Sequence, residues 1–291
     1  MTNPTTTNTS IPQRLLSLTW KFLRLPVFVY IGIVLVMWLF QNRIVFQPST
    51  LRKDTSRLTS PSNSDIFLTQ DLGNESYRIH ALLFEHPSPR GYALYFHGNG
   101  GCIDHRSAYL QILSKRLEIT ILGVSYSGYG LSAGTPSEEA FYRDSETAYK
   151  YLTERYGVSN SSIICFGESM GGAVATRLAS KHQVGILALD STFTSLPDVA
   201  KLKYPWLPVR RLLRTNLPTV EFASKYKGIT VQTHGTEDNI VPFSLGSTLA
   251  DSFTGRHFFI VRNGGKHNEL PDDEYLERID QELANLPATN K

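Results

Sequence analysis

The N-terminal part of the chain carries one long apolar run. Between Arg24 and Arg43, residues 25–42 contain no charged side chain. As a helix, a run of this length rises roughly 27 Å, which is close to the hydrocarbon thickness of a thin bilayer. The run ends in bulky residues at 38–40, whereas a signal peptide generally ends in small ones. We therefore predict a disordered or juxtamembrane tail at 1–24 and an uncleaved transmembrane signal-anchor helix at 25–42. A cleaved signal peptide and a buried core helix are the alternatives.

The rest of the chain alternates short apolar runs with segments of helical periodicity. After a Ser/Thr/Pro-rich linker at 43–64, two runs predict an antiparallel strand pair at 66–71 and 77–86, joined at Gly73-Asn74. Further runs are almost continuously apolar, as strands covered on both faces are, at 92–98, 119–126, 162–167, 185–190, 229–235 and 256–262. This strand–helix alternation predicts an α/β domain at 65–291, with a mostly parallel sheet and helices on both faces.

The clearest helical pattern follows residue 134. Thr135 is a candidate N-cap, Pro136 suits the first turn, and Glu138 completes a capping box. Gly157 is the residue type that most often ends a helix. We therefore predict a helix between Thr135 and Gly157.

Composition and charge narrow the function classes. The chain has 291 residues, of which 41% are hydrophobic and 19% charged, a globular balance. The net charge is only +3 and no long basic run stands beside stacked aromatics, so nucleic acid is not a predicted partner. Cys102 and Cys165 are the only cysteines, which excludes a disulfide framework, and no Cys/His spacing resembles a zinc site. We predict neither a metal nor a cofactor.

A glycine-rich turn follows the apolar run at 162–167. The sequence there reads Gly-Glu-Ser-Met-Gly over residues 167–171, between a predicted strand and a helical segment. In that context the Gly-x-Ser-x-Gly pattern predicts a nucleophile elbow, a strained turn that exposes the Ser169 hydroxyl above the sheet. The following helix directs backbone N–H groups toward the site, which favours negative charge on a bound oxygen. Glu168 needs no chemical role in such a turn.

A serine hydroxyl needs a base to take its proton, and the base needs an acid to orient it. Of the eight histidines, His267 stands in a polar, glycine-preceded loop after the last predicted strand, and we predict it as the base. Asp238 follows the strand at 229–235 and is the predicted acid, because the chain order serine, acid, histidine fits hydrolases with this elbow. Asp190 and Glu237 are the alternatives for the acid.

The oxygen of a tetrahedral intermediate needs hydrogen-bond donors that are already in place. Met170, directly after the nucleophile, supplies one backbone N–H. The loop 97–101, which reads His-Gly-Asn-Gly-Gly, supplies the other. We predict Asn99 as that second donor, with Gly100 as the alternative, and thus an oxyanion hole of Asn99 and Met170.

Six motifs, in order across roughly residues 95–270, resemble the alpha/beta-hydrolase superfamily: YFHGNGG, YSGYGLSAGTPSE, GESMGGAVA, DSTFTS, HGTEDNIVP and GGKHNEL. Together they are similar to the bud-emergence-type hydrolases, whose animal relatives are alpha/beta-hydrolase domain protein thirteen and, more distantly, the group numbered seventeen. The resemblance implies an alpha/beta-hydrolase fold and a membrane-anchored serine hydrolase. The seventeen group removes palmitoyl chains from proteins, but its N-terminus is cysteine-rich and lipidated, whereas this chain has a membrane-spanning run there.

A short cap over the site is predicted at about 191–228, within the domain. The candidates for lining an acyl pocket are Tyr204, Trp206 and Leu207. The candidates for binding lipid phosphates are Arg210, Arg211 and Arg214. A small surface helix with a solvated basic face is the alternative interpretation of the same residues.

These features predict hydrolysis of carboxylic esters or thioesters through an acyl-enzyme on Ser169, with lipids or palmitoylated proteins as candidate substrates. A serine peptidase on the same fold is an alternative, although a clear peptide-recognition insert is missing. A catalytically idle hydrolase fold that acts as an interaction module at a membrane is another. The sequence identifies the bilayer as a partner and names no protein partner.

Charges around the apolar run are nearly balanced, so the positive-inside rule decides little about its orientation, and a loose count of the flanking charges favours a cytosolic domain. Lys21 and Arg24 lie close to its N-terminal end, against Arg43 at the other end. The resemblance to signal-anchored hydrolases also implies a short cytosolic tail. We therefore predict a lumenal catalytic domain, in the endoplasmic reticulum or another endomembrane such as the vacuole. Asn-x-Ser/Thr acceptors that test this orientation lie at Asn8, Asn74 and Asn160.

Overall fold

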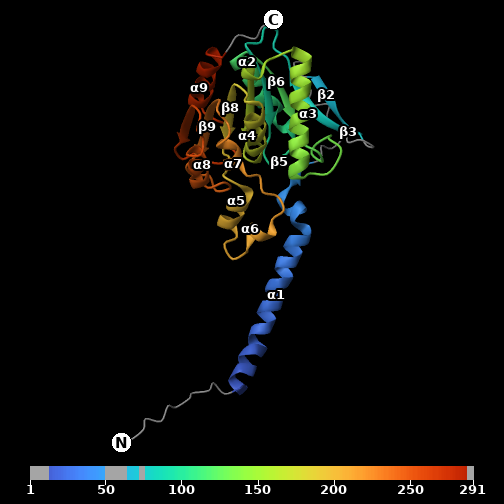
Figure 1. Ribbon diagram of the computed structural model, residues 1–291, viewed down its shortest axis with the longest axis vertical. Helices are drawn as coiled ribbons and strands as arrows, with labels where there is room; N and C mark the ends of the chain where they lie inside the picture. The colour runs from blue at the N-terminus through green and yellow to red at the C-terminus, as the bar shows by residue number, and fades with distance from the viewer. Residues whose placement is uncertain (1–12, 50–63, 72–75, 287–291) are drawn as a thin grey trace, which may run out of the picture. The chain divides into compact units, whose positions relative to one another are not determined.

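The computed structural model describes residues 13–49, 64–71 and 76–286, which divide into two units (Figure 1). The first unit ends at Ile44 and contains one long helix. The second begins at Val45 and contains a large sheet with helices packed against it.

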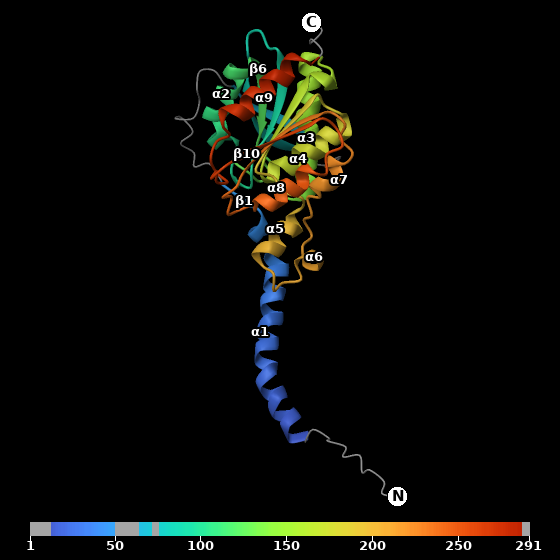
Figure 2. The same ribbon diagram turned by 90° about the vertical axis from the view of Figure 1, so that its left-hand side faces the viewer.

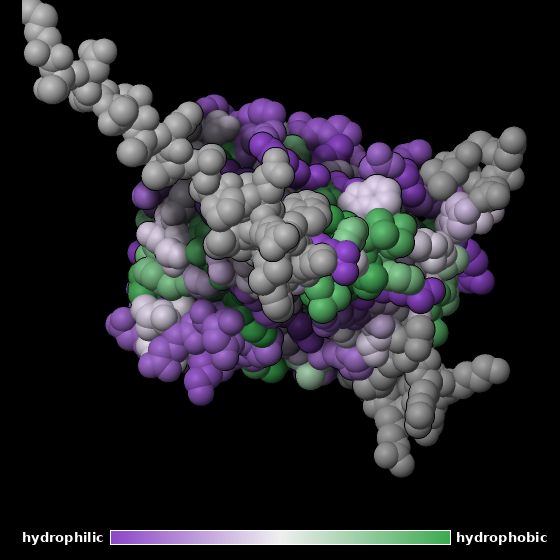
Figure 3. Space-filling model, turned by 90° about the horizontal axis from the view of Figure 1, so that it is seen from below, coloured by the Kyte–Doolittle hydropathy of each residue, from purple (hydrophilic) through white to green (hydrophobic). Residues whose placement is uncertain are grey.

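Helix α1 spans Gln13–Val45 and includes the predicted span at 25–42. Its stretch Arg24–Val45 has 22 residues with a mean hydropathy of 1.9, and its most apolar window is only 6% buried. A core helix of this composition would be covered, yet Leu25 and Phe28 are 69% and 68% exposed. Figure 3 shows the face seen from below, where patches of hydrophobic residues, in green, lie among hydrophilic ones, in purple. The helix is therefore long and apolar enough to cross a membrane.

Eight strands form one sheet in the order β10-β9-β8-β7-β4-β6-β3-β2. Neighbours from β10 to β6 pair in parallel, whereas β3 pairs antiparallel with both β6 and β2. The strands are β2 Ser64–Asp71, β3 Ser76–Phe84, β4 Gly91–Phe96, β6 Ile119–Val124, β7 Ile163–Glu168, β8 Ile186–Asp190, β9 Ile229–Gly235 and β10 His257–Arg262. The predicted α/β class and mostly parallel sheet are confirmed. The predicted turn at Gly73-Asn74 lies outside the described residues.

Helices cover both faces of this sheet, as Figures 1 and 2 show. Helices α2 (Ser107–Leu117) and α9 (Asp273–Ala284) share one core with one set of strand side chains. Helices α3 (Glu138–Tyr156), α4 (Met170–His182) and α8 (Phe243–Ala250) share the other core with the alternate set. Along β4, for example, Ala93 and Tyr95 belong to the first core, and Leu94 and Phe96 to the second. Burial on both faces explains why the strands are continuously apolar.

The N-cap of α3 differs from the prediction. The helix begins at Glu138, and the Ser137 hydroxyl accepts the cap hydrogen bond from the Ala140 N–H at 3.1 Å. The predicted cap at Thr135 is therefore wrong, because Pro136 lies outside the helix. A Cβ added at Gly128 would lie 2.6 Å from Cδ of Pro136, so the proline packs tightly against this turn. The predicted end at Gly157 is confirmed, with φ of 63°.

The chain between β8 and β9 contains three short helices. They are α5 Leu196–Lys203, α6 Val209–Leu212 and α7 Thr219–Ala223. The Ser195 hydroxyl caps α5 by accepting from the Asp198 N–H. Leu207 is buried, whereas Leu202 and Trp206 are each 53% exposed. This segment is the one predicted to form the cap.

A second, two-stranded sheet has no counterpart among the predicted strands. Strand β1 (Gln47–Pro48) pairs in parallel with β5 (Gly100–Gly101), which lies within the predicted oxyanion loop. Phe46, just before β1, is only 2% exposed and belongs to the core that contains α3 and α4. The sequence predicts a linker at 43–64, whereas residues 45–49 pack within the sheet-containing unit. The prediction misses them because a short run before a proline carries no strand periodicity.

Candidate active site

The polar residues predicted for the site gather at one edge of the sheet. Strands β4, β7, β8, β9 and β10 run parallel, so their carboxyl ends lie along the same edge. That edge is where open α/β sheets bind their ligands. The residues at or soon after these five ends are, in order, His97, Ser169, Asp190, Asp238 and His267.

Ser169 occupies a strained turn between β7 and α4. Its φ of 51° and ψ of −115° lie outside the regions that residues with a Cβ usually adopt, at a cost on the order of 1–3 kcal/mol. A Cβ added at Gly167 would lie 2.6 Å from Cα of Gly172, so the turn closes only with glycine there. The strain is held in place by backbone contacts, including the Ser169 N–H, which donates to the Asp190 carbonyl at 2.8 Å.

Glycine also lets the first turn of α4 approach its neighbours closely. A Cβ added at Gly171 would lie 2.0 Å from the Phe96 carbonyl oxygen, and one at Gly172 would collide with the Thr192 hydroxyl. A Cβ added at Gly98 would in turn lie 3.5 Å from Cβ of Ser169. The end of β4 and the loop that follows it are therefore in direct contact with the nucleophile elbow.

The structure brings the three predicted catalytic side chains together. His267 Nε2 lies 3.1 Å from the Ser169 hydroxyl oxygen, and His267 Nδ1 lies 2.6 Å from Asp238 Oδ2. Ser169, Asp238 and His267 are 8%, 7% and 8% exposed. Each distance is within hydrogen-bond reach, and burial shields the three groups from water. The arrangement is the one that the predicted roles of nucleophile, base and orienting acid require.

Asp238 is held as a carboxylate by several donors. Its Oδ1 accepts the backbone N–H groups of Ile240 and Val241 at 2.9 and 2.8 Å. His234 Nε2 lies 3.2 Å from Oδ2. Burial acts to raise the pKa of Asp238, but hydrogen bonds from His234 and His267 outweigh it and hold the pKa well below its ordinary value. His234 was not among the predicted site residues, although it lies in the same HGTED motif.

The two alternative acids have other places in the structure. Asp190 Oδ1 lies 2.9 Å from Arg262 Nη2, and burial raises the pKa of Asp190 to about 6. Arg262 also donates through Nη1 to the Glu269 carbonyl at 2.9 Å, just after His267. Asp190 therefore supports the histidine loop through Arg262. Glu237 is exposed.

The predicted oxyanion donors come from two different segments of the chain. Met170 begins α4, so its backbone N–H is among the free N–H groups of the first turn. Asn99 lies in the loop that contacts the elbow, and its side chain is engaged away from the nucleophile, donating to the Val45 carbonyl at 2.6 Å. The N–H of Asn99 or Gly100 as the second donor remains a prediction.

His97, which opens this loop, supports it without carrying charge. Its Nδ1 donates to the Gly98 carbonyl at 2.7 Å, and its ring packs 4.6 Å from that of Tyr126, measured between centroids. Burial lowers the pKa of His97 to about 4, so the imidazole is neutral near pH 7. The Nε2 atom has no hydrogen-bond partner within the described part of the chain.

Glu168 makes several hydrogen bonds that the elbow sequence does not predict. Arg106 donates to both of its oxygens, through Nε at 2.7 Å and Nη2 at 2.5 Å, and the Tyr95 hydroxyl donates at 3.0 Å. Burial acts to raise the pKa of Glu168, but the bonds and charge of Arg106 leave it below the ordinary value. The sequence gives no signal for this contact, because Glu168 and its two partners come from three separate segments of the chain.

A cavity of about 360 Å³ opens beside His267. Its apolar wall includes Tyr109, Ile112, Leu270 and Pro271, and its charged residues include Arg106, Glu168 and Asp190. The cap residues Tyr204, Trp206 and Leu207, candidates for lining an acyl pocket, are not among those that line it. The space next to the predicted base is thus lined by α2, by the last residues of β7 and β8, and by the loop after β10.

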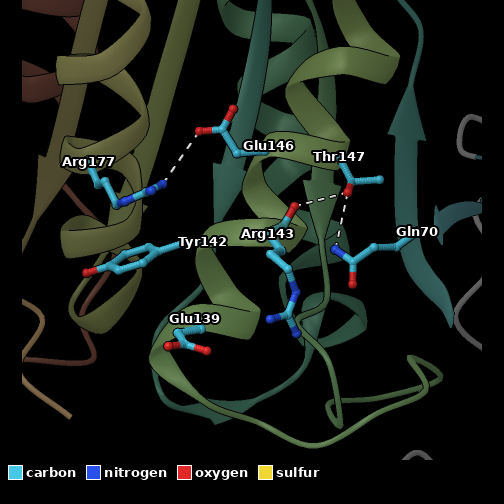
Figure 4. A pocket seen from close by; sticks show the side chains of 7 residues that line it. All are labelled: Gln70, Glu139, Tyr142, Arg143, Glu146, Thr147 and Arg177. Carbon is cyan, nitrogen blue, oxygen red and sulfur yellow. Dashed lines mark hydrogen bonds and ion pairs between the residues drawn. The ribbon is translucent and has the colours of Figure 1, made fainter. Parts of the chain in front are cut away.

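A second cavity, of about 510 Å³, lies over α3 and α4 (Figure 4). Arg177 Nη1 lies 3.5 Å from Glu146 Oε1, and the Arg177 guanidinium lies 4.2 Å from the ring centroid of Tyr142. Gln70 Nε2 donates to the Thr147 hydroxyl at 3.3 Å. None of the three predicted catalytic residues lines this cavity. It is a surface hollow away from the predicted chemistry.

One group of potential metal ligands lies within the described residues, at Asp65, His80 and Asp104. His80 Nε2 lies 3.0 Å from Asp65, and His80 Nδ1 lies 3.7 Å from Asp104. The two carboxylates thus face different nitrogens of one ring, whereas a metal ion takes only one nitrogen from a histidine. The geometry fits a histidine clamped by two carboxylates better than a metal centre.

A mostly parallel sheet with a serine elbow, a histidine and an acid at its edge defines an alpha/beta hydrolase. A family model described as Hydrolase_4, serine aminopeptidase S33, matches residues 87–232. An uncharacterized protein of Mycobacterium tuberculosis is 32% identical over 82% of this chain and 84% of its own length. The chain belongs to this alpha/beta-hydrolase family.

Other relatives agree with the resemblance drawn from the motifs. Protein bem46 of Schizosaccharomyces pombe is 40% identical over 43% of this chain and 42% of its own length. Alpha/beta hydrolase domain-containing protein 17C of mouse is 31% identical over 67% of this chain and 60% of its own length. The predicted resemblance to bud-emergence-type hydrolases is confirmed.

Solved structures show the same fold. An esterase of Pyrococcus furiosus superposes with a TM-score of 0.65 at 14% identity, over 83% of this chain and 97% of that chain. Est1E of Butyrivibrio proteoclasticus with bound ferulic acid gives a TM-score of 0.59 at 16% identity, over 76% and 96% of the two chains. At these identities the likeness concerns the fold alone.

Proposed function

We propose that the protein is a membrane-anchored serine hydrolase that cleaves carboxylic esters or thioesters through an acyl-enzyme on Ser169. The observation that carries this proposal is the buried chain of contacts from Ser169 to His267 at 3.1 Å and from His267 to Asp238 at 2.6 Å. Lipid esters and protein-bound palmitoyl groups are the substrate classes that a membrane anchor would bring to high local concentration. No cofactor enters the mechanism.

In the first half-reaction, His267 Nε2 takes the hydroxyl proton while Ser169 Oγ bonds to the substrate carbonyl carbon. The carbonyl oxygen becomes negative and accepts hydrogen bonds from the N–H groups of Met170 and Asn99. Asp238 stabilises the imidazolium. When the intermediate collapses, the bond to the alcohol or thiol breaks, and the leaving group takes the proton from His267.

In the second half-reaction, water replaces the leaving group. His267 Nε2 accepts a proton from this water as its oxygen attacks the acyl carbon. The bond from the acyl carbon to Ser169 then breaks, the proton returns to the serine oxygen, and the carboxylic acid departs. The low pKa of Asp238 supports this role, since the acid stays ionised throughout.

Two of the three acids that line the cavity beside His267 are paired with arginines. Glu168 pairs with Arg106, and Asp190 pairs with Arg262. The third acid, Glu269, is exposed, and its carboxylate accepts the Lys266 backbone N–H at 2.9 Å. Recognition of a peptide's free amino terminus requires an acidic group that is not already neutralised, so Glu168 and Asp190 are unsuited to it.

A fluorophosphonate probe tests the proposal on the full chain in detergent. We expect rapid covalent labelling, in which Ser169 Oγ bonds to phosphorus and fluoride leaves, and we expect no labelling of Ser169→Ala. An unlabelled but folded wild-type chain would instead favour the idle interaction module. A screen of esters and thioesters of increasing acyl length, in the same detergent, then identifies the preferred substrate class.

Orientation in the membrane is a separate part of the proposal, and glycosylation tests it. A lumenal domain predicts a glycan at Asn74 and none at Asn8. The third acceptor, Asn160, is less suitable than the sequence indicates, because its Nδ2 donates to the His182 carbonyl at 2.8 Å. We expect a gel shift on deglycosylation that disappears in Asn74→Gln and persists in Asn8→Gln. A glycan on Asn8 alone would place the active site in the cytosol.

A further inference from the structure

The predicted oxyanion loop is tied to the last residue of α1 and to the residues that directly follow it. Asn99 Nδ2 donates to the carbonyl of Val45, the last residue of α1, at 2.6 Å. Asn99 Oδ1 accepts the Gln47 backbone N–H at 3.1 Å and the Tyr129 hydroxyl at 2.9 Å. One amide side chain thus bonds at both of its ends to hold the loop.

Backbone pairing and packing strengthen the same contact. Gln47 and Pro48 pair with Gly100 and Gly101, and the Ser49 N–H donates to the Gly101 carbonyl at 3.2 Å. The Ser49 carbonyl in turn accepts the Gly130 N–H at 3.1 Å. The ring of Phe46 packs edge-on against Phe141, 5.2 Å between centroids, which fixes this segment to the core.

The opposite side of the loop faces the nucleophile. Gly98 lies beside Ser169, since a Cβ added at Gly98 would be 3.5 Å from Cβ of Ser169, and Gly171 of α4 lies against the Phe96 and His97 carbonyls. Three of the five loop residues at 97–101 are glycines, whose backbone has the widest conformational freedom. Such a loop needs contacts from outside to keep a donor fixed, and the segment Val45–Ser49 supplies them.

We propose that Asn99 is a positioning residue, through which the segment Val45–Ser49 holds the oxyanion loop in its catalytic conformation. The inference rests on the proposed function, since it assigns a role in stabilising the oxyanion. The segment lies outside the region 87–232 that the family model matches. In this proposal, the segment Val45–Ser49 contributes to catalysis by positioning the oxyanion loop, in addition to connecting the domain to the predicted membrane anchor.

Two substitutions in the full chain, purified in detergent, test this role. Asn99→Ala removes the amide but keeps the backbone N–H proposed as the donor, and Tyr129→Phe removes one hydroxyl while keeping the ring. Because a misplacement of about 1 Å can cost about 10²-fold in rate, we expect Asn99→Ala to lower kcat for a short activated ester roughly 10- to 100-fold. Tyr129→Phe should give a smaller decrease in the same direction. KM should change little in both variants.

Matched controls remove similar groups elsewhere. Tyr142→Phe deletes a hydroxyl that donates to Glu138 at 2.9 Å, and Asn285→Ala deletes an amide that donates to the Gln281 carbonyl at 2.9 Å. Both should retain the wild-type kcat. The pH at half-maximal rate should also stay unchanged in the two test variants, because the contact between His267 and Asp238 is untouched.

Active-site titration separates positioning from stability. Rates are expressed per titrated serine, so a loss of folded protein lowers the titre but leaves kcat per site unchanged. A wild-type kcat per site in both Asn99→Ala and Tyr129→Phe would overturn the positioning role while leaving the proposed hydrolase intact. If the wild-type activity survives Ser169→Ala, the proposed function itself fails, so the two failures are distinguishable.

Discussion

Ser169→Ala will abolish hydrolysis of an activated ester while the chain remains folded. Alanine keeps the backbone of the elbow but removes the oxygen that bonds to the acyl carbon. Removing a member of a serine–histidine–acid triad costs about 10⁴-fold or more in kcat. The measurement is the initial rate on a chromogenic short-chain ester, with the wild type and variant at equal concentration in the same detergent.

A second serine provides the control for this prediction. Ser252→Ala removes a hydroxyl that donates to the Thr248 carbonyl at 3.0 Å, outside the predicted site, and should retain full activity. Circular dichroism and thermal melting establish that both variants are folded. Substantial turnover by folded Ser169→Ala would remove Ser169 from the mechanism.

Asp238→Asn will lower turnover far more than Asp190→Asn. Asp238 Oδ2 lies 2.6 Å from His267 Nδ1. The asparagine amide of the variant would lack the charge that stabilises the imidazolium, and it would disturb the tautomer of His267. In serine hydrolases of this kind the loss is about 10⁴-fold in kcat. The assay compares kcat of the two variants on the same ester, at matched folded concentrations.

Asp190→Asn should act only indirectly. Asparagine can still accept from Arg262 Nη2, so the link from Arg262 to the Glu269 carbonyl and the histidine loop can persist. We expect a modest decrease in kcat. If Asp190→Asn proves the more damaging substitution at equal thermal stability, the orienting acid is Asp190 and the assignment of Asp238 is wrong.

Local chemistry made part of this site predictable from sequence. The strained turn at Ser169 can be predicted because Gly167 and Gly171, both close to it in sequence, stand where only glycine fits. The positions of His267 and Asp238 can be predicted because each follows a strand of a parallel sheet, where side chains converge at one edge. In each case the signal lies within a short stretch of the chain.

Contacts between distant segments were not predictable in this way. Arg106 and Glu168 are 62 positions apart, and Asn99 and Val45 are 54 apart, so neither spacing carries a periodic signal. The N-cap of α3 was misplaced for a different reason. Thr135 and Ser137 are both good caps, and the packing of Pro136 against Gly128 decided between them. Tertiary contacts thus fixed what local preference left open.

The burial of Phe46 has a practical consequence for producing a water-soluble fragment. Trimming the anchor where the regular sheet begins, near residue 64, would delete a ring that is 2% exposed and packed against Phe141. Losing a buried phenylalanine side chain costs about 3–5 kcal/mol, a large share of the roughly 5–15 kcal/mol that stabilises a typical domain. Such a fragment would expose core surface and tend to aggregate during expression. A fragment that begins at Val45 would lack most of the apolar helix but would keep the Phe46 ring in the core.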